Sequence, residues 1–270
     1  MTRRAVVVVF HKEWQLCRSR VRLLRALNPD IAVHAILGGS RSEHAEATAC
    51  LESVVDSSSS CRLGDGRWQW QHTDLVIRDW HRHHGCAHAF DVLHVMQWDL
   101  LLFAPLAHLY RHVPPEAIAL TGLTALEEIR DRWYWTTAEP HGTEAQALFE
   151  SARIRWPFTG EGKACLGPGM ALPRSFLDRY ADEDIPELGH DELRVPLFGE
   201  IFGHDLIDTG FYPRWFDPDS ECLFNANGLE LTVPDVRREL NNRHGRRAFH
   251  PCRLSFTEEL VHELRRTTTA

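Results

Sequence analysis

The chain has 270 residues, enough for one large domain or two small ones, and 43% hydrophobic with 25% charged residues is the balance of an ordinary globular protein. A net charge of −8 argues against the basic surface that recruits nucleic acid, and we find no apolar run of about 18 residues that would span a membrane. The seven cysteines never form a CxxC pair, which argues against a disulfide framework or zinc knuckle and predicts a reducing, cytoplasmic location.

The first part of the chain alternates between strand and helix patterns. Residues 5–10, AVVVVF, predict a strand buried on both faces, and because this block is short and followed by charge we expect no signal peptide. Residues 13–27 have helical spacing, residues 31–40 predict a strand that ends in a Gly-Gly turn, and residues 42–55 predict a helix with Ser42 as N-cap. This order is typical of a parallel sheet with crossover helices, and DSSSSCRLGDG, residues 56–66, then predicts a polar loop.

The remaining patterns are less regular. A helix is predicted around residues 73–84, a buried strand over the apolar run 91–106, and a helical segment over 123–135 in an otherwise mixed stretch. Residues 163–181 predict a strand, a Gly-Pro-Gly turn, a strand and a helix capped near Ser175, and residues 189–206 predict a helix with acidic residues at its start. A last helix is predicted to begin at Thr257. With no repeat and no clear linker, we expect a single α/β domain.

The run DVLHVMQWDLLLFAPL, residues 91–106, contains a carboxylate toward its end, Asp99. In open α/β sheets ligands bind beyond the carboxyl ends of the strands, so we expect this carboxylate at that edge. A buried carboxylate needs a donor, a cation or water to offset its lost hydration. Two interpretations stay open, a ligand-binding carboxylate and an aspartate that caps the following turn.

The order of VVVVFHKEW, IAVHAILGG, QWD, GPGMALPRSFL, GHDEL and FHP resembles that of the GT-A glycosyltransferases, over roughly residues 5–252. The resemblance implies a single GT-A-like, Rossmann-like α/β domain over residues 1–270, with a mixed central sheet flanked by helices. Residues 1–106 would form the nucleotide-binding half and residues 107–270 the acceptor-binding half. The implied activity is a glycosyltransferase of hexosyltransferase type that moves a sugar from a nucleotide-diphosphate sugar to an acceptor hydroxyl, with inversion.

The same resemblance implies a divalent metal, Mn²⁺ or Mg²⁺. The D-x-D motif of the family corresponds here to Gln97, Trp98 and Asp99, so its first acidic residue is replaced by Gln97. Asp99 and His250, in AFHPCR, would hold a cation that neutralises the charge on the leaving diphosphate, since hard cations prefer oxygen ligands. The alternative for His250 is an ordinary surface or core histidine.

The family's catalytic base corresponds to Asp191 or Glu192 at the start of a predicted helix, and we favour Asp191. An acidic pair at a helix start is also common for dipole reasons alone. The donor site would include seven positions, which are Phe10, His11, Arg82, Gly167 and Gly169 together with the motif residues Gln97 and Trp98. The two glycines allow close backbone approach to a ligand, although a plain turn or tight packing would also use them.

Three other functions remain as alternatives. A nucleotidyltransferase would carry a Gly-rich phosphate loop after the first strand, and FHKEWQ has no glycine. A nicotinamide-dependent reductase would carry GxGxxG, which is absent from the sequence. A catalytically degenerate sugar-nucleotide-binding protein is favoured by Gln97 alone. His81, His84 and His88 have helical spacing that suggests zinc, but Gly85 interrupts the helix, so we interpret them as its polar end.

Overall fold

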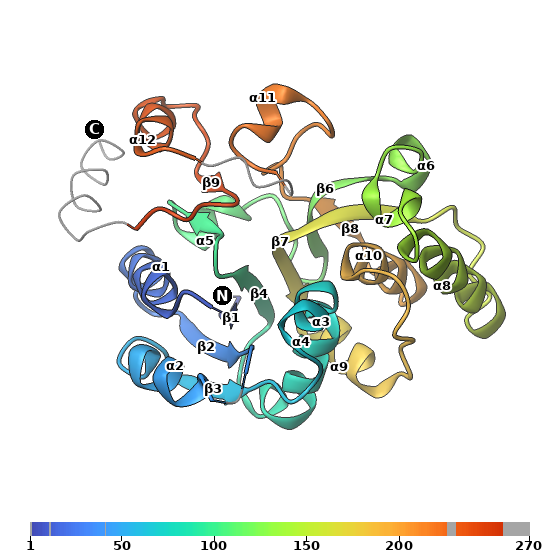
Figure 1. Ribbon diagram of the computed structural model, residues 1–270, viewed down its shortest axis with the longest axis horizontal. Coiled ribbons are helices and arrows are strands. Elements are labelled where there is room, and N and C mark those ends of the chain that lie inside the picture. Colours follow the sequence, from blue (N-terminus) through green and yellow to red (C-terminus); the bar gives the residue numbers. More distant parts are fainter. Residues whose placement is uncertain (1, 11, 41, 226–230, 256–270) are drawn as a thin grey trace.

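The structure is a computed structural model that describes residues 2–10, 12–40, 42–225 and 231–255. Its centre is a seven-stranded sheet in the order β3-β2-β1-β4-β7-β6-β8 (Figure 1). The strands are β1 (Arg4–Phe10), β2 (Ala32–Leu37), β3 (Ser57–Ser60), β4 (Val92–Gln97), β6 (Ile118–Ala125), β7 (Lys163–Pro173) and β8 (Leu206–Asp208). Only β7 runs antiparallel to its neighbours, β4 and β6. The predicted α/β class with a mixed central sheet is confirmed.

Helices cover both faces of this sheet (Figure 1). Ala5, Val7 and Val9 of β1 belong to one apolar cluster, and Val6, Val8 and Phe10 to another, because successive strand residues point to opposite faces. The first cluster includes α4 (Thr73–His83), α8 (His141–Arg155), α9 (Arg174–Asp182) and α10 (Asp191–Ile201), and the second includes α1 (Trp14–Leu27) and α2 (His44–Leu51). Burial on both faces explains the unbroken apolar run in β1.

A smaller unit closes one end of the main sheet. Strands β5 (Leu101–Leu102) and β9 (Ala248–Phe249) pair antiparallel, and they pack with α12 (Val233–Asn241) in a third apolar cluster. The short helices are α3 (Gly66–Gln71), the 3-10 turn η1 (Gly85–Ala87), α5 (Leu106–Leu109), α6 (Leu126–Ile129), α7 (Tyr134–Thr137) and α11 (Pro218–Glu221). Because β5 follows β4 directly, its pairing with β9 brings residue 250 beside residue 99. None of the described helices is long and apolar enough to cross a membrane.

Several expected elements differ from the structure. The serine run expected as a loop is strand β3, which pairs in parallel with β2 from Ser57 onward. Residues 163–173 form one strand rather than two. Instead of the expected turn around Gly169, the pairing of β7 with β6 shifts register there, and Gly169 has a φ of +88°. Helix α2 has Glu43 rather than Ser42 as its N-cap residue, and α9 follows Pro173. Helix α8 was not predicted from the sequence. The helix expected from Thr257 lies outside the described residues.

Candidate functional site

A cleft of about 810 Å³ opens where β1 and β4 end and β7 begins. Lys12 follows β1, the Gln97–Asp99 segment follows β4, and Leu166 and Pro168 belong to β7. The start of α10 and the segments 132–135, 212–216 and 250–253 complete the wall. The cleft therefore lies at the sheet edge where the sequence predicts a ligand, beyond the carboxyl ends of the parallel strands.

Asp99 and His250 meet on one side of this cleft. Nε2 of His250 lies 3.4 Å from Oδ1 of Asp99, and each side chain is only about one-tenth exposed. Nδ1 of His250 is 2.7 Å from the carbonyl oxygen of Asn225, which can only accept, so Nδ1 carries a hydrogen and donates it. Burial opposes ionisation of Asp99, but the hydrogen bond and charge of His250 outweigh it and hold the pKa of that carboxyl below its usual value.

This pair fits part of a divalent metal site. A carboxylate oxygen and an imidazole nitrogen are common ligands, and a hydrogen bond from the other ring nitrogen to a carbonyl is the usual way in which a ligating histidine is oriented. Within the described residues, no group of three or more His, Cys, Asp or Glu side chains could hold a metal. Asp99 and His250 could therefore supply only two of a metal's ligands.

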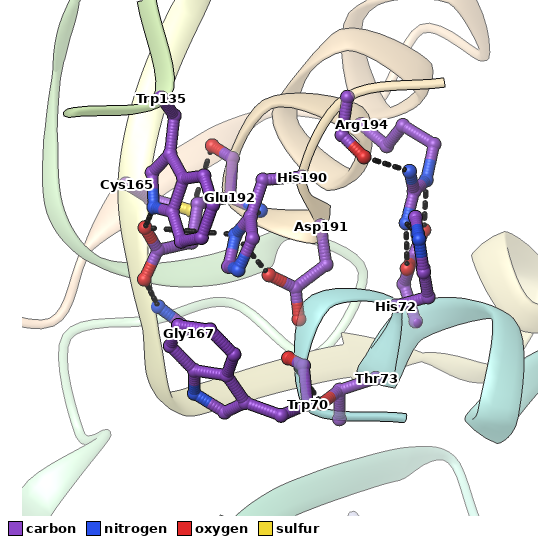
Figure 2. Close-up of polar contacts among 12 residues, drawn as sticks. Trp70, His72, Thr73, Trp135, Cys165, Gly167, His190, Asp191, Glu192 and Arg194 are labelled. Carbon is purple, nitrogen blue, oxygen red and sulfur yellow. Dashed lines mark hydrogen bonds and ion pairs between the residues drawn. The ribbon is translucent and has the colours of Figure 1, made fainter. Parts of the chain in front are cut away.

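Glu192, in the first turn of α10, also lines the cleft. Its Oε1 accepts a hydrogen bond from the backbone N–H of Gly167 at 2.8 Å, and its Oε2 accepts one from Nε1–H of Trp135 at 3.0 Å (Figure 2). Burial raises the pKa of Glu192 to about 7, and the negative charge of Asp191 also raises it. His190 and the two N–H donors lower the pKa of Glu192 and so offset part of this rise. Glu192 can therefore gain or lose a proton near neutral pH.

Asp191 has different surroundings from Glu192. It is 1% exposed and is not among the described residues that line the cleft. Its Oδ1 lies 2.7 Å from Nδ1 of His190, so the two side chains form a buried ion pair (Figure 2). Burial would lower the pKa of His190, but the carboxylates of Asp191 and Glu192 outweigh this and raise it. Asp191 thus faces His190, whereas Glu192 lines the cleft, and the choice between them as the base stays a prediction.

The segment before α10 is anchored by Arg194, whose side chain is fully buried. Its Nη1 donates to the carbonyl oxygens of Leu188 and Gly189 at 2.9 and 2.6 Å. Its Nε and Nη2 donate to the two carboxylate oxygens of Asp74, in the first turn of α4, at 2.9 and 2.6 Å. A buried carboxylate stabilises the buried guanidinium, and this two-bond geometry fixes the chain immediately before His190.

Two other predicted residues line the cleft, and a third, Gly167, lies between the lining residues Leu166 and Pro168. Gln97 and Trp98 line it, and the Trp98 ring is approached by the cations of Lys12 at 5.0 Å and Arg253 at 5.8 Å. Gly167 gives its N–H to Glu192, and a side chain there would come within 3.2 Å of the Gln97 amide nitrogen. The glycine thus allows close approach, although the group it approaches is the protein's own.

Three predicted positions do not belong to the cleft. Phe10 is fully buried in the apolar cluster on the α1 side, since it is the last residue of a strand covered on both faces. Arg82 lines a separate depression with residues of α4 and donates to the carbonyl oxygen of Ala181. Gly169 packs against Phe211 and Thr121 in the interior. His11 lies outside the described residues.

The sequence interpretation missed most of the aromatic and cationic wall. Trp70 and Tyr134 line the cleft and are 44% and 55% exposed, which is unusual for large apolar side chains. Further residues of the wall are Arg67, Arg132, Trp133, Trp135, Trp215 and Phe216. The dense aromatic run RWYW, residues 132–135, is the one local signal that would have marked this wall. His190 was also missed, although it precedes the predicted acidic pair directly.

No family model and no curated protein matches the chain. Several solved structures are similar to the chain. An active-site mutant of LgtC has 12% identity and a TM-score of 0.43, with 80% of this chain and 81% of that chain covered. The mannosyltransferase PcManGT from Pyrobaculum calidifontis, solved with GDP-Man and Mn²⁺, has 13% identity and a TM-score of 0.44, with 77% and 54% covered.

The glycosyltransferase GlyE of Streptococcus pneumoniae TIGR4 has 12% identity and a TM-score of 0.37, with 77% of this chain and 45% of that chain covered. The solved structures to which this chain is similar are glycosyltransferases. The chain spans only about half the length of PcManGT and GlyE. Because these identities are 12–13%, any statement about activity depends on the residues of the cleft.

Proposed function

We propose that this protein is a metal-dependent glycosyltransferase that moves a sugar from a nucleotide-diphosphate sugar to an acceptor hydroxyl with inversion. One observation carries the proposal. A single cleft brings the Asp99–His250 pair, suited to a cation, together with Glu192, a carboxylate whose pKa is raised to about 7. Donor activation and acceptor deprotonation need these two kinds of group in one place.

The donor would lie on the Asp99 side. Asp99 and His250 would hold Mn²⁺ or Mg²⁺, which when bound neutralises negative charge on the departing diphosphate. Lys12, after β1, and Arg253, after β9, both lie near the Trp98 ring and line the cleft. Their charges would attract the phosphates, which the Asp99 carboxylate alone would repel.

The acceptor would lie on the Glu192 side. As the acceptor oxygen forms its bond to the anomeric carbon, the bond from that carbon to the diphosphate breaks and Glu192 takes the hydroxyl proton. The exposed rings of Trp70 and Tyr134 support this arrangement, because the electron-rich faces of aromatic rings suit the C–H groups of a sugar. Residues from both halves of the chain, from Lys12 to Arg253, line the cleft.

The test is release of nucleoside diphosphate from UDP-, GDP- and dTDP-sugars with Mn²⁺, with and without EDTA. We expect turnover by the wild type that EDTA abolishes. Asp99→Asn should lose turnover by about 100-fold or more, and urea unfolding would check that the variant is still folded. Asp30→Asn is the matched control, since Asp30 is exposed and is not among the described residues that line the cleft.

Two outcomes would contradict parts of the proposal. Turnover that is indifferent to both EDTA and Asp99→Asn would exclude the metal site. Binding of a nucleotide sugar without any turnover would instead support a catalytically degenerate binding protein, the alternative suggested by Gln97 in place of an acidic residue.

A further inference from the structure

Trp135 contacts the two ionisable side chains at the start of α10 that line the cleft, those of the N-cap residue His190 and of Glu192. Its Nε1–H donates to Oε2 of Glu192 at 3.0 Å, and its ring stacks on the imidazole of His190 with centroids 3.8 Å apart and planes 19° apart (Figure 2). The side chain is 7% exposed and itself forms part of the cleft wall. One buried indole therefore fixes the positions of two groups that can exchange protons.

The backbone that presents Trp135 is held in place by local side-chain bonds. Helix α7 has four residues, too few to be stable alone. The hydroxyls of Thr136 and Thr137 both donate to the carbonyl oxygen of Trp133, at 2.9 and 2.8 Å, and that of Thr136 also donates to the carbonyl oxygen of Arg130 at 2.6 Å. These bonds reinforce the turn, so that the indole approaches Glu192 from a fixed direction.

We propose that Trp135 is a positioning residue for proton transfer, which holds Glu192 in its ionised form and so determines the pH range in which the acceptor hydroxyl is activated. This inference rests on the proposed function. A donor hydrogen bond to a carboxylate stabilises its charged form, and the bond strengthens where water is excluded. Glu192 is buried enough for one such bond to matter, since the exposed fraction of the residue is 6%.

The other groups that face Glu192 include one further N–H donor, that of Gly167, which lowers the pKa of Glu192 as Trp135 does and which a change at Trp135 leaves in place. His190, the N-cap of α10, and Asp191, its first residue, have opposite effects on the pKa of Glu192. From β7 come the N–H of Gly167 and the thiol of Cys165, which donates to the backbone carbonyl of Glu192 at 3.5 Å. Burial raises the pKa of that thiol, so it stays neutral. From α7, Trp135 contributes an uncharged donor that a phenyl ring lacks.

Trp135→Phe therefore separates the N–H from the aromatic packing. In this variant the pKa of Glu192, measured by ¹³C NMR titration of its side-chain carboxyl, should rise by about one pH unit. The acid limb of the pH–rate profile should move upward by the same amount. Near pH 7 the rate should fall by about 5-fold, and it should recover as the pH is raised, because the carboxylate is restored.

Trp156→Phe is the matched control. Trp156 also donates its Nε1–H to a carboxylate, Glu183 at 3.4 Å, but it is not among the described residues of the cleft wall. It should leave the Glu192 titration and the acid limb in place. An unchanged titration in Trp135→Phe, or a loss of rate that no pH restores, would overturn the inference. An inactive wild type would refute the proposed function, while the carboxyl titration would still test the role of Trp135.

Discussion

Asp191 and Glu192 are neighbours in the chain, and their carboxylates nevertheless have different partners. Adjacent residues on a helix point about 100° apart, so one turn can direct one carboxylate to a histidine and the other to a cleft. Asp191 pairs with His190, while Glu192 receives two N–H donors and keeps a raised pKa of about 7. The environment, and not the residue type, thus divides their roles.

Glu192→Gln should reduce sugar transfer by about 10²-fold or more, the usual contribution of a general base, with donor binding retained. Asp191→Asn should cost less, because its carboxylate acts only through its charge on His190 and Glu192, and the pKa of His190 should fall when the paired charge is removed. Steady-state transfer assays with donor titration would compare the two variants. Full activity of Glu192→Gln with an inactive Asp191→Asn would reverse the assignment.

Glu192 should also make stability depend on pH. Its folded pKa lies above the ordinary value, so the folded state binds its proton more tightly than the unfolded chain. The contribution of this group is fully present below the unfolded pKa and is lost as the pH rises through about 7. In urea unfolding at pH 5 and pH 8, the wild type should lose more stability between the two pH values than Glu192→Gln. Equal losses would show that Glu192 titrates normally.

At the scale of elements, α10 is the helix on which the site depends. Its start is fixed by Arg194, which binds Asp74 of α4 and the carbonyl oxygens just before His190. Inside the helix, Pro196 has no N–H to offer the carbonyl of Glu192 four residues earlier, and the Cys165 thiol donates to that carbonyl instead. Contacts from α4 and β7 therefore hold the first turn of α10 in its position.

Arg194→Met should destabilise the fold by about 3–5 kcal/mol, because it leaves the Asp74 carboxylate buried without its partner. The double variant Asp74→Leu with Arg194→Met should cost less than the sum of the two single changes. Urea unfolding of the wild type, both single variants and the double variant completes the cycle. Additive effects would mean that the two side chains do not stabilise each other.

At the scale of the whole molecule, the main sheet joins both halves of the chain. Strands β1–β4 come from residues 1–106, whereas β6, β7 and β8 come from the second half, and the cleft is lined from both. The division into a nucleotide-binding and an acceptor-binding half stays a prediction. A ligand that binds across this cleft would stabilise the entire fold by mass action.

Thermal unfolding tests this coupling without requiring turnover. At a concentration of about 100 times Kd, the correct nucleotide sugar with Mn²⁺ should add about 2.7 kcal/mol, or roughly 5–10 °C in Tm for a chain of this size. Asp99→Asn should lose the Mn²⁺-dependent part of the shift. Equal shifts with UDP-, GDP- and dTDP-sugars would indicate that the base of the nucleotide is not recognised.

The sequence alone determined the elements whose pattern is local. The apolar block of β1, the helical spacing of α1 and α4, the acidic start of α10 and the position of Asp99 just after β4 all follow from periodicity and from the strand-end rule. These features could be predicted because each depends on residues that are close together in the chain. The same short stretches also show which faces of an element are buried.

Only the tertiary structure decided which of these residues meet. Ser57–Ser60 form a strand because their backbone pairs with the edge of β2, and not because serine favours strands. His250 lies beside Asp99 because β9 pairs with β5. Trp135 reaches Glu192 from a short helix that no periodicity marks, while Phe10 is directed into the core by the face of β1 on which it falls. Contacts between residues far apart in the chain depend on the order of the strands in the sheet and on how the loops pack. A local sequence pattern carries no information about either.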